Sequence, residues 1–294
     1  MLTHSNEATR PSRVVILGAG GFVASATHRR LDELAVPVLA LPRAALDLTD
    51  RASVARLVEL LRPEDTLLFV AANAPVKNEA MLLTNLRMGA AVCDALQRVP
   101  VRHVVYISSD AVYADSQKPL TERSCAQPGS LHGVMHLARE VMLANAYGGA
   151  LCFVRPTLIY GPADPHNGYG PNRFMRLAAL GEDIILFGEG EERRDHVWID
   201  DVTRVVTRVV LQGSSGVINV AVGEVVSFSD VAKLATRLMG TGTQVRSSPR
   251  VGPMPHNGLR PFDVSGLLEA FPDFRCVEVP EGLEKVRDAY RSSR

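Results

Sequence analysis

Residues 14–24 read VVILGAGGFVA, a run of aliphatic residues that leads directly into a glycine-rich turn. The apolar residues 14–17 predict a buried strand, and the amphipathic stretch 23–34 predicts a helix. A tight turn needs glycine, and its small residues let a pyrophosphate approach the backbone N–H groups at the start of the helix. The strand, turn and helix together therefore predict a dinucleotide-binding site rather than a plain connection.

The rest of the chain continues this alternation of short apolar runs and longer amphipathic stretches. Strands are expected at 36–41, 66–71, 104–108 and 151–155, and helices at 51–62, 79–98 and 131–146. Such alternation is typical of a parallel sheet with helices on both faces. The sequence thus predicts the α/β class, with a doubly wound parallel sheet.

After residue 161 the chain changes character and becomes rich in proline and glycine, so we expect it to leave the sheet there. A further strand is expected at 216–222, where the chain would return. We therefore expect a dinucleotide-binding domain over 12–161 plus about 194–222. A smaller, discontinuous substrate domain would comprise about 162–193 plus 223–294.

Composition narrows the range of partners. The 32 basic residues balance the 32 acidic ones, which gives no electrostatic support for a nucleic-acid partner. No apolar run is long enough to span a membrane, and the polar first dozen residues lead us to expect a cytoplasmic protein. The four cysteines have no C-x-x-C spacing and are expected to be buried thiols: Cys93, Cys125, Cys152 and Cys276.

The second strand and the residues after it indicate which cofactor binds. An acidic residue at its end would bind the ribose hydroxyls of NAD, but residues 36–43 read VPVLALPR and end in Arg43. A guanidinium group pairs well with a 2′-phosphate. NADP is therefore the preferred cofactor and NAD a possible one, while the alternative for Arg43 is a solvated surface charge.

Several ordered segments resemble the extended short-chain dehydrogenase/reductase family, whose members are NAD(P)-dependent nucleotide-sugar epimerases, dehydratases and reductases. The matching segments are 18–24, 47–50, 71–72, 108–113, 155–162, 187–190 and 194–202, together with Asn85. The resemblance implies a Rossmann fold, an enzyme that uses NAD(P), and a nucleotide-sugar substrate. It also implies a homodimer formed through the helices at 79–98 and 131–146.

The resemblance also implies roles for individual residues. The cofactor would be bound by Gly18, Gly20, Gly21, Phe22, Val23, Arg43, Asp47, Leu48, Ala71, Ala72, Asn85, Ser108 and His136. The substrate would be bound by Ser109, Asn172, Arg194, Arg250 and Arg260, of which Arg194 lies within the clearest motif.

The catalytic pair departs from the family pattern of a tyrosine followed four positions later by a lysine. Residues 128–140 read PGSLHGVMHLARE, which places His132 at the tyrosine position and His136 at the lysine position. Imidazole titrates near neutrality and needs no neighbouring cation to act as a base. We therefore expect His132 to move the proton in place of the tyrosine and His136 to hydrogen-bond the nicotinamide ribose, beside Ser109, which would polarise the substrate oxygen.

Asp110 stands where the dehydratases of the family carry an acid. The glutamate that accompanies this acid is Ala111 here, so dehydration is not favoured. The structural alternative for Asp110 is a carboxylate that accepts hydrogen bonds from nearby backbone N–H groups. Asp110 is kept with Ser109, His132 and His136 as a candidate catalytic residue.

Two other interpretations of the histidine pair remain. Histidines four residues apart share a helix face and can bind a metal, but no third ligand is evident and none is predicted. The stronger alternative is a catalytically silent protein that binds NAD(P) or a nucleotide sugar and regulates or partners an active relative. The leading prediction is an NAD(P)-dependent epimerase or oxidoreductase that acts on a nucleotide-activated sugar.

Overall fold

The computed structural model describes residues 2–5 and 10–292, which form two compact units. Unit 1 comprises Met1–Ala114, Glu122–Pro156 and Val202–Val220, and unit 2 comprises Asp115–Thr121, Thr157–Asp201 and Ala221–Arg294. The compact units thus divide at residues 156 and 202, whereas the sequence placed the divisions at 161 and 194. The assignment of one unit to the cofactor and the other to the substrate stays a prediction.

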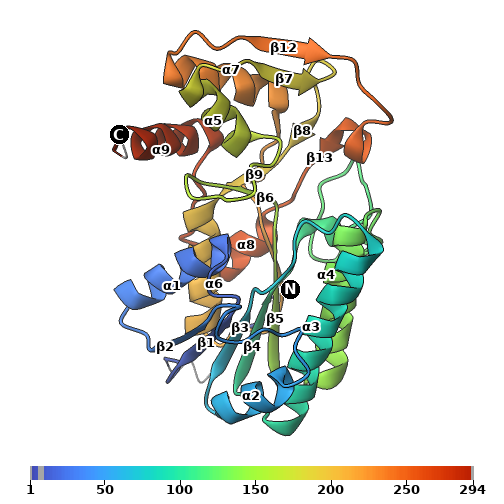
Figure 1. Ribbon diagram of the computed structural model, residues 1–294, viewed down its shortest axis with the longest axis vertical. Helices are drawn as coiled ribbons and strands as arrows, with labels where there is room; N and C mark the ends of the chain where they lie inside the picture. The colour runs from blue at the N-terminus through green and yellow to red at the C-terminus, as the bar shows by residue number, and fades with distance from the viewer. Residues whose placement is uncertain (1, 6–9, 293–294) are drawn as a thin grey trace. The chain divides into compact units, whose positions relative to one another are not determined.

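Unit 1 is built on a six-stranded parallel sheet, which confirms the predicted α/β class (Figure 1). In spatial order the strands are β10 (Gly216–Val220), β5 (Ala150–Pro156), β4 (His103–Ile107), β3 (Thr66–Phe69), β1 (Val14–Leu17) and β2 (Val38–Leu41). β1, β3 and β4 are buried along their whole length, because helices cover both faces of a parallel sheet.

The helices of unit 1 lie on opposite faces of this sheet (Figure 1). One face carries α2 (Ser53–Leu60), α3 (Glu79–Arg98) and α4 (Leu131–Ala146), and α3 packs against both of the others. The other face carries α1 (Phe22–Glu33) and the main part of α6 (Ile199–Leu211), which begins in unit 2. The short 3-10 helix η1 (Asp110–Val112) follows β4.

The main core of unit 1 lies between the sheet and α2, α3 and α4. Its buried side chains include Leu17, Leu48, Leu57, Phe69, Val92, Leu96, Val104, Tyr106 and Leu143. Side-chain caps begin two of these helices: Asn78 accepts a hydrogen bond from Met81 N, and Ser130 accepts one from Gly133 N. α3 and α4 therefore start at the residues that the sequence predicted.

Unit 2 combines three small sheets with a helical layer. Two of the sheets are parallel pairs, β6 (Leu158–Tyr160) with β9 (His196–Trp198) and β7 (Ile184–Phe187) with β12 (Val245–Ser248). The three-stranded sheet is β11 (Val226–Ser227), β8 (Arg193–Arg194) and β13 (Leu259–Arg260). The helices are α5 (Pro171–Leu180), α7 (Phe228–Met239), α8 (Ser265–Ala270), α9 (Val279–Ser292) and the 3-10 helix η2 (Pro255–Gly258). α5 packs against α7 and α9, around the buried rings of Phe174 and Phe228.

All four cysteines are free thiols. Cys93 and Cys152 are buried as predicted, and burial raises the pKa of the Cys93 thiol to about 11. The prediction was wrong for Cys125, which is exposed, and for Cys276, which is half-buried, because each lies outside the helices and strands. Within residues 2–5 and 10–292, no helix combines the length and the apolar composition that crossing a bilayer requires.

Candidate functional site

The glycine turn after β1 places two glycines in different surroundings. Gly18 has a φ of +83°, and a Cβ there would lie 2.6 Å from the Cα atom of Ala71. A Cβ at Gly20 would meet no atom of the described chain within 4 Å. Gly18 is therefore needed for the approach of two backbone segments, whereas Gly20 borders open space in which a ligand can lie.

The start of α1 suits an anionic group. The helix begins at Phe22 after Gly21, and among the described residues no side chain caps it and no acidic residue lies in its first turn. Val23 lies in that turn, and the fully buried Ala24 lets the helix pack closely on the sheet. The backbone N–H groups at this end thus fit a cofactor pyrophosphate.

Arg43 and Asp47 form an ion pair, with 2.9 Å between Arg43 Nε and Asp47 Oδ2. The Arg43 side chain is 77% exposed. Hydrogen bonds from Thr49 and then from Arg43 lower the pKa of the Asp47 carboxyl to about 2. Leu48 packs in the core of unit 1, so only its backbone is available to an adenine ring.

The loop after β3 is held by Asn85 and by Arg139, a residue that the sequence did not indicate. Asn85 accepts a hydrogen bond from Asn73 N and donates to the oxygens of Asn73 and Met81. Arg139 is fully buried and donates to Ala71 O at 2.8 Å and to Asn85 O at 3.0 Å. Asn85 and Arg139 therefore fix the loop that carries Ala71 and the exposed Ala72, and a cofactor role of Asn85 stays a prediction.

The two serines after β4 differ in their partners. Ser108 is buried and donates to Glu140 Oε1 at 2.6 Å, and Glu140 also pairs with Arg155. Ser109 is half-buried; its Oγ accepts from Ala111 N at 3.1 Å and lies 3.3 Å from Asp110 Oδ1. Ser108 thus belongs to a buried network, while Ser109 caps η1 at the end of β4.

Gly133 brings the first turn of α4 against η1, since a Cβ at this position would collide with Ala111 O. His132 therefore lies beside the serine motif, where burial lowers the pKa of its imidazole and the Asp110 carboxylate opposes that shift. The buried Nδ1 of His132 has no hydrogen-bond partner within the described part of the chain. The ring is neutral, and Nδ1 keeps unused hydrogen-bonding capacity.

His136 lies one helical turn further along α4. Its ring meets that of His132 edge to face, with 4.7 Å between centroids, and its Nδ1 lies 2.8 Å from Tyr106 Oη. Its exposed fraction is 6%, and burial, followed by His132 and Arg139, lowers the pKa of the imidazole well below its usual value. The hydrogen bond to Tyr106 thus holds His136 in place as a neutral ring.

The four substrate candidates of unit 2 fall into three places. Arg194 and Arg260 are register partners in β8 and β13. Arg250 lies elsewhere, with its Nη2 2.9 Å from Phe187 O and 3.1 Å from Glu191 Oε1. Asn172 is buried at the start of α5 and lines a cavity. The structure therefore brings Arg260 to Arg194, although spacing alone had left Arg260 a weaker candidate.

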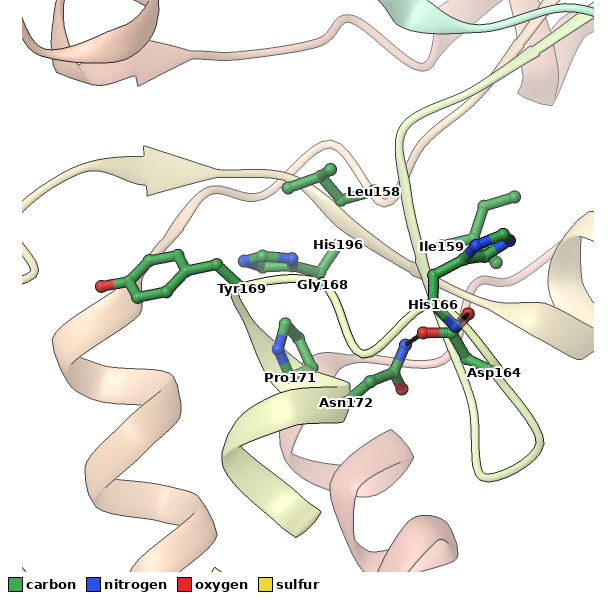
Figure 2. Close-up of a pocket in the computed structure, with 9 residues that line it drawn as sticks. All are labelled: Leu158, Ile159, Asp164, His166, Gly168, Tyr169, Pro171, Asn172 and His196. Atoms are coloured by element: carbon green, nitrogen blue, oxygen red, sulfur yellow. Dashed lines mark hydrogen bonds between the residues drawn. The ribbon is translucent and has the colours of Figure 1, made fainter. Parts of the chain in front are cut away.

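Sequence reasoning also missed His196 and Asp164, which line the same cavity as Asn172 (Figure 2). His196 lies in a strand that matches a family motif, so sequence reasoning assigned it no separate role. An imidazole in an apolar strand nevertheless needs hydrogen-bond partners. That requirement is the signal by which the sequence might have identified it.

The chain matches a known family and a known protein in sequence. The sequence model of the NAD dependent epimerase/dehydratase family matches residues 14–221. The chain is 27% identical to dTDP-4-dehydro-6-deoxy-D-allose reductase of Streptomyces bikiniensis, and the alignment covers 95% of this chain and 96% of that protein.

Two solved structures have the same fold. UDP-glucose 4-epimerase of Thermotoga maritima with UDP-glucose has a TM-score of 0.85 at 22% identity and covers 96% of this chain and 99% of that chain. UDP-glucose 4-epimerase of Thermus thermophilus in complex with NAD has a TM-score of 0.83 at 23% identity and covers 96% and 100%.

Proposed function

The chain belongs to the NAD-dependent epimerase/dehydratase family, and from that premise we propose that it is an NAD(P)-dependent epimerase or oxidoreductase that acts on a nucleotide-activated sugar. The similarity to a dTDP-sugar reductase along almost the whole chain supports this substrate class. The space beside Gly20 and the uncapped start of α1 fit a dinucleotide. When bound, its nicotinamide would accept or donate the hydride.

The observation that carries this proposal is the position of His132 against the serine motif, which Gly133 makes possible. A neutral imidazole there accepts a proton from a sugar hydroxyl as the carbon that bears this hydroxyl is oxidised. It returns the proton when the carbon is reduced. Ser109, whose hydroxyl otherwise donates to Asp110 Oδ1, turns to donate a hydrogen bond to the same oxygen. Asp110 keeps the pKa of His132 from falling as far as burial alone would lower it.

His136 supports this arrangement as a neutral neighbour. Because burial keeps its ring uncharged, it places no second cation against His132. With Nδ1 committed to Tyr106, only its other nitrogen can reach a nicotinamide ribose.

For the cofactor we infer a preference for NADP, with NAD also accepted. The exposed Arg43 supports the preference, because a guanidinium group binds a 2′-phosphate through charge-assisted hydrogen bonds. Asp47 already pairs with the Arg43 guanidinium, which limits the preference for NADP.

We also infer a homodimer formed through α3 and α4. These helices carry exposed apolar side chains, Leu83 on α3 and Val134 and Val141 on α4. A Val141→Glu variant that sediments as a monomer while the native chain sediments as a dimer would support this interface. The cytoplasmic location stays a prediction.

A second candidate function is a silent binder of NAD(P) or nucleotide sugar. One observation favours it: His136, at the position of the family's lysine, is buried and anchored to Tyr106. Such a protein would bind both ligands without turnover.

The deciding experiment compares the native chain with His132→Phe. NADP(H) and NAD(H) are supplied with a panel of UDP- and dTDP-sugars, and hydride transfer and sugar products are followed across pH. We expect His132→Phe to lower kcat by about 10²-fold or more, with cofactor Kd changed by less than about twofold. His28→Phe, in the middle of α1 and outside the glycine turn, is the matched control. Unchanged turnover in His132→Phe would refute the role of His132, and tight binding without turnover in the native chain would support the silent binder.

A further inference from the structure

Unit 2 contains a cavity of about 160 Å³ between the β6–β9 pair and the start of α5 (Figure 2). Apolar parts of its wall come from Leu158, Ile159 and Pro171. Polar parts come from His196 on β9, from Asp164 and Asn172, and from His166 and Tyr169. Figure 2 shows that the hydrogen-bonded Asp164–Asn172 pair and the His196 imidazole project from separate segments. The cavity therefore has both an apolar wall and polar groups that come from separate segments.

His196 is the feature that needs an explanation. Its side chain is 0% exposed, and neither ring nitrogen has a hydrogen-bond partner among residues 2–5 and 10–292. Its ring packs edge to face on Phe228, with 5.5 Å between centroids, which satisfies no hydrogen bond. Buried polar groups in native proteins are almost always paired. Because His196 lines the cavity, a ligand there can supply the missing partners.

The opposite polar wall has hydrogen-bonding capacity left. Asn172 accepts from Gly161 N at 2.9 Å and donates one of its two amide hydrogens to Asp164 Oδ2 at 2.7 Å. Asp164 Oδ1 accepts from His166 N at 3.1 Å. Each carboxylate oxygen can accept two hydrogen bonds, so Asp164 can still accept and Asn172 can still donate.

Charge and chemistry restrict what this cavity accepts. The Asp164 carboxylate repels anions, and burial, followed by Arg194, lowers the pKa of His196 to about 3, so its ring is neutral. No group of three metal-ligating side chains is found among the described residues, which leaves a metal ion without a ligand set. A hydroxyl group both donates and accepts, so hydroxyl groups can satisfy a neutral imidazole at either nitrogen.

Size completes the description of the ligand. A protein cavity of about 150 Å³ is known to hold one benzene molecule, so a cavity of this volume has room for a single ring. Apolar walls beside a few polar groups are typical of small-molecule sites.

We propose that this cavity binds an uncharged, hydroxylated ring and that His196 determines specificity by hydrogen-bonding one of its hydroxyl groups. The identification of that ring as part of a nucleotide sugar, either the sugar or the ribose, rests on the proposed function. The sugar and the ribose are both hydroxylated rings, and calorimetry with and without the sugar distinguishes them.

The binding experiment uses isothermal titration calorimetry of UDP-glucose, dTDP-glucose, UDP and dTDP with the native chain and with His196→Phe. The variant keeps the ring and its packing on Phe228 but loses both nitrogens. We expect it to bind the nucleotide sugars about tenfold more weakly. If the cavity holds the sugar, the affinity for UDP and dTDP is unchanged, and if it holds the ribose, their affinity falls equally. His28→Phe should match the native chain throughout. Equal affinities of His196→Phe and the native chain for all ligands would overturn the inference and leave the proposed function standing.

A second measurement needs no variant and separates the inference from the proposed function. The ¹⁵N resonances of the His196 imidazole are followed while D-glucose or D-ribose is added to the native chain. If no nucleotide sugar binds but a free sugar shifts these resonances, the proposed function fails and the inference stands. If neither nucleotide sugars nor free sugars shift them, the inference is overturned.

Discussion

Arg194 and Arg260 lie opposite each other in adjacent parallel strands of unit 2, β8 and β13. Register partners in a parallel pair project their side chains to the same face of the sheet. Arg194 Nη1 is 3.2 Å from Glu192 Oε1, and Arg260, which is 1% exposed, places Nη1 3.0 Å from Asp115 Oδ1. Two guanidinium groups thus share one face while carboxylates hold each in place, an arrangement suited to a diphosphate.

We predict that Arg194→Met weakens the binding of UDP and dTDP by about tenfold to a hundredfold, because a charge-assisted contact is lost. Arg193→Met is the matched control: Arg193 is the neighbouring residue, is exposed and projects to the opposite face of β8. Calorimetry of both variants at two salt concentrations tests this prediction. Equal losses in the two variants would indicate a general charge effect instead of a contact by Arg194.

The two glycines of the turn should separate folding from cofactor binding. Gly18→Ala places a Cβ at a left-handed position against the backbone of Ala71, so we expect a loss of about 1–3 kcal/mol in the free energy of unfolding. Gly20→Ala meets no protein atom within 4 Å and should leave stability within about 0.5 kcal/mol while weakening NAD(P) binding. Urea unfolding and cofactor titration measure the two effects. If Gly20→Ala bound the cofactor normally, the pyrophosphate would lie elsewhere.

The Arg43–Asp47 pair should set the choice between NADP and NAD. Removing the cation in Arg43→Ser should lower the affinity for NADP by about tenfold and leave that for NAD nearly unchanged. Asp47→Asn frees Arg43 from its carboxylate and should shift the preference further toward NADP. The ratio of the two dissociation constants, measured by fluorescence titration of NADPH and NADH, tests both variants. A ratio that neither variant changes would place the 2′-phosphate away from Arg43.

Buried His196 should make the ligand-free protein less stable in acid. Its pKa is near 6.5 in the unfolded chain and about 3 in the folded one, so between these values the unfolded state binds the extra proton. The contribution of this pKa difference to the free energy of unfolding is therefore complete above about pH 6.5. It is lost as pH falls toward 3, by about 1.4 kcal/mol per pH unit. Between pH 7.5 and pH 5.0, His196→Phe should lose about 2 kcal/mol less than the native chain in urea unfolding. His28→Phe serves as the control, and identical losses in His196→Phe and the native chain would show that His196 is protonated equally in both states.

Local pattern was sufficient for α3, α4 and the glycine turn. α3 and α4 have the predicted limits because caps and apolar periodicity are properties of neighbouring residues, and the turn at Gly18 follows from the type of residue needed between a strand and a helix. The positions of His132 and His136 on one helix face follow from their spacing. The same reasoning identified Arg43, but not the carboxylate of Asp47 that binds it.

By itself, then, the sequence determined the α/β class, the glycine turn and the unusual histidine pair, since each depends on residues close together in the chain. Only the tertiary structure decided that Arg260 meets Arg194, that Arg139 holds the loop at Ala71 and that Tyr106 anchors His136. It also decided that His196 lines a cavity with no hydrogen-bond partner in the described part of the chain. These relationships join segments distant in sequence. Whether a polar side chain meets water, a hydrogen-bond partner or neither is set by the packing around it rather than by its neighbours in the chain.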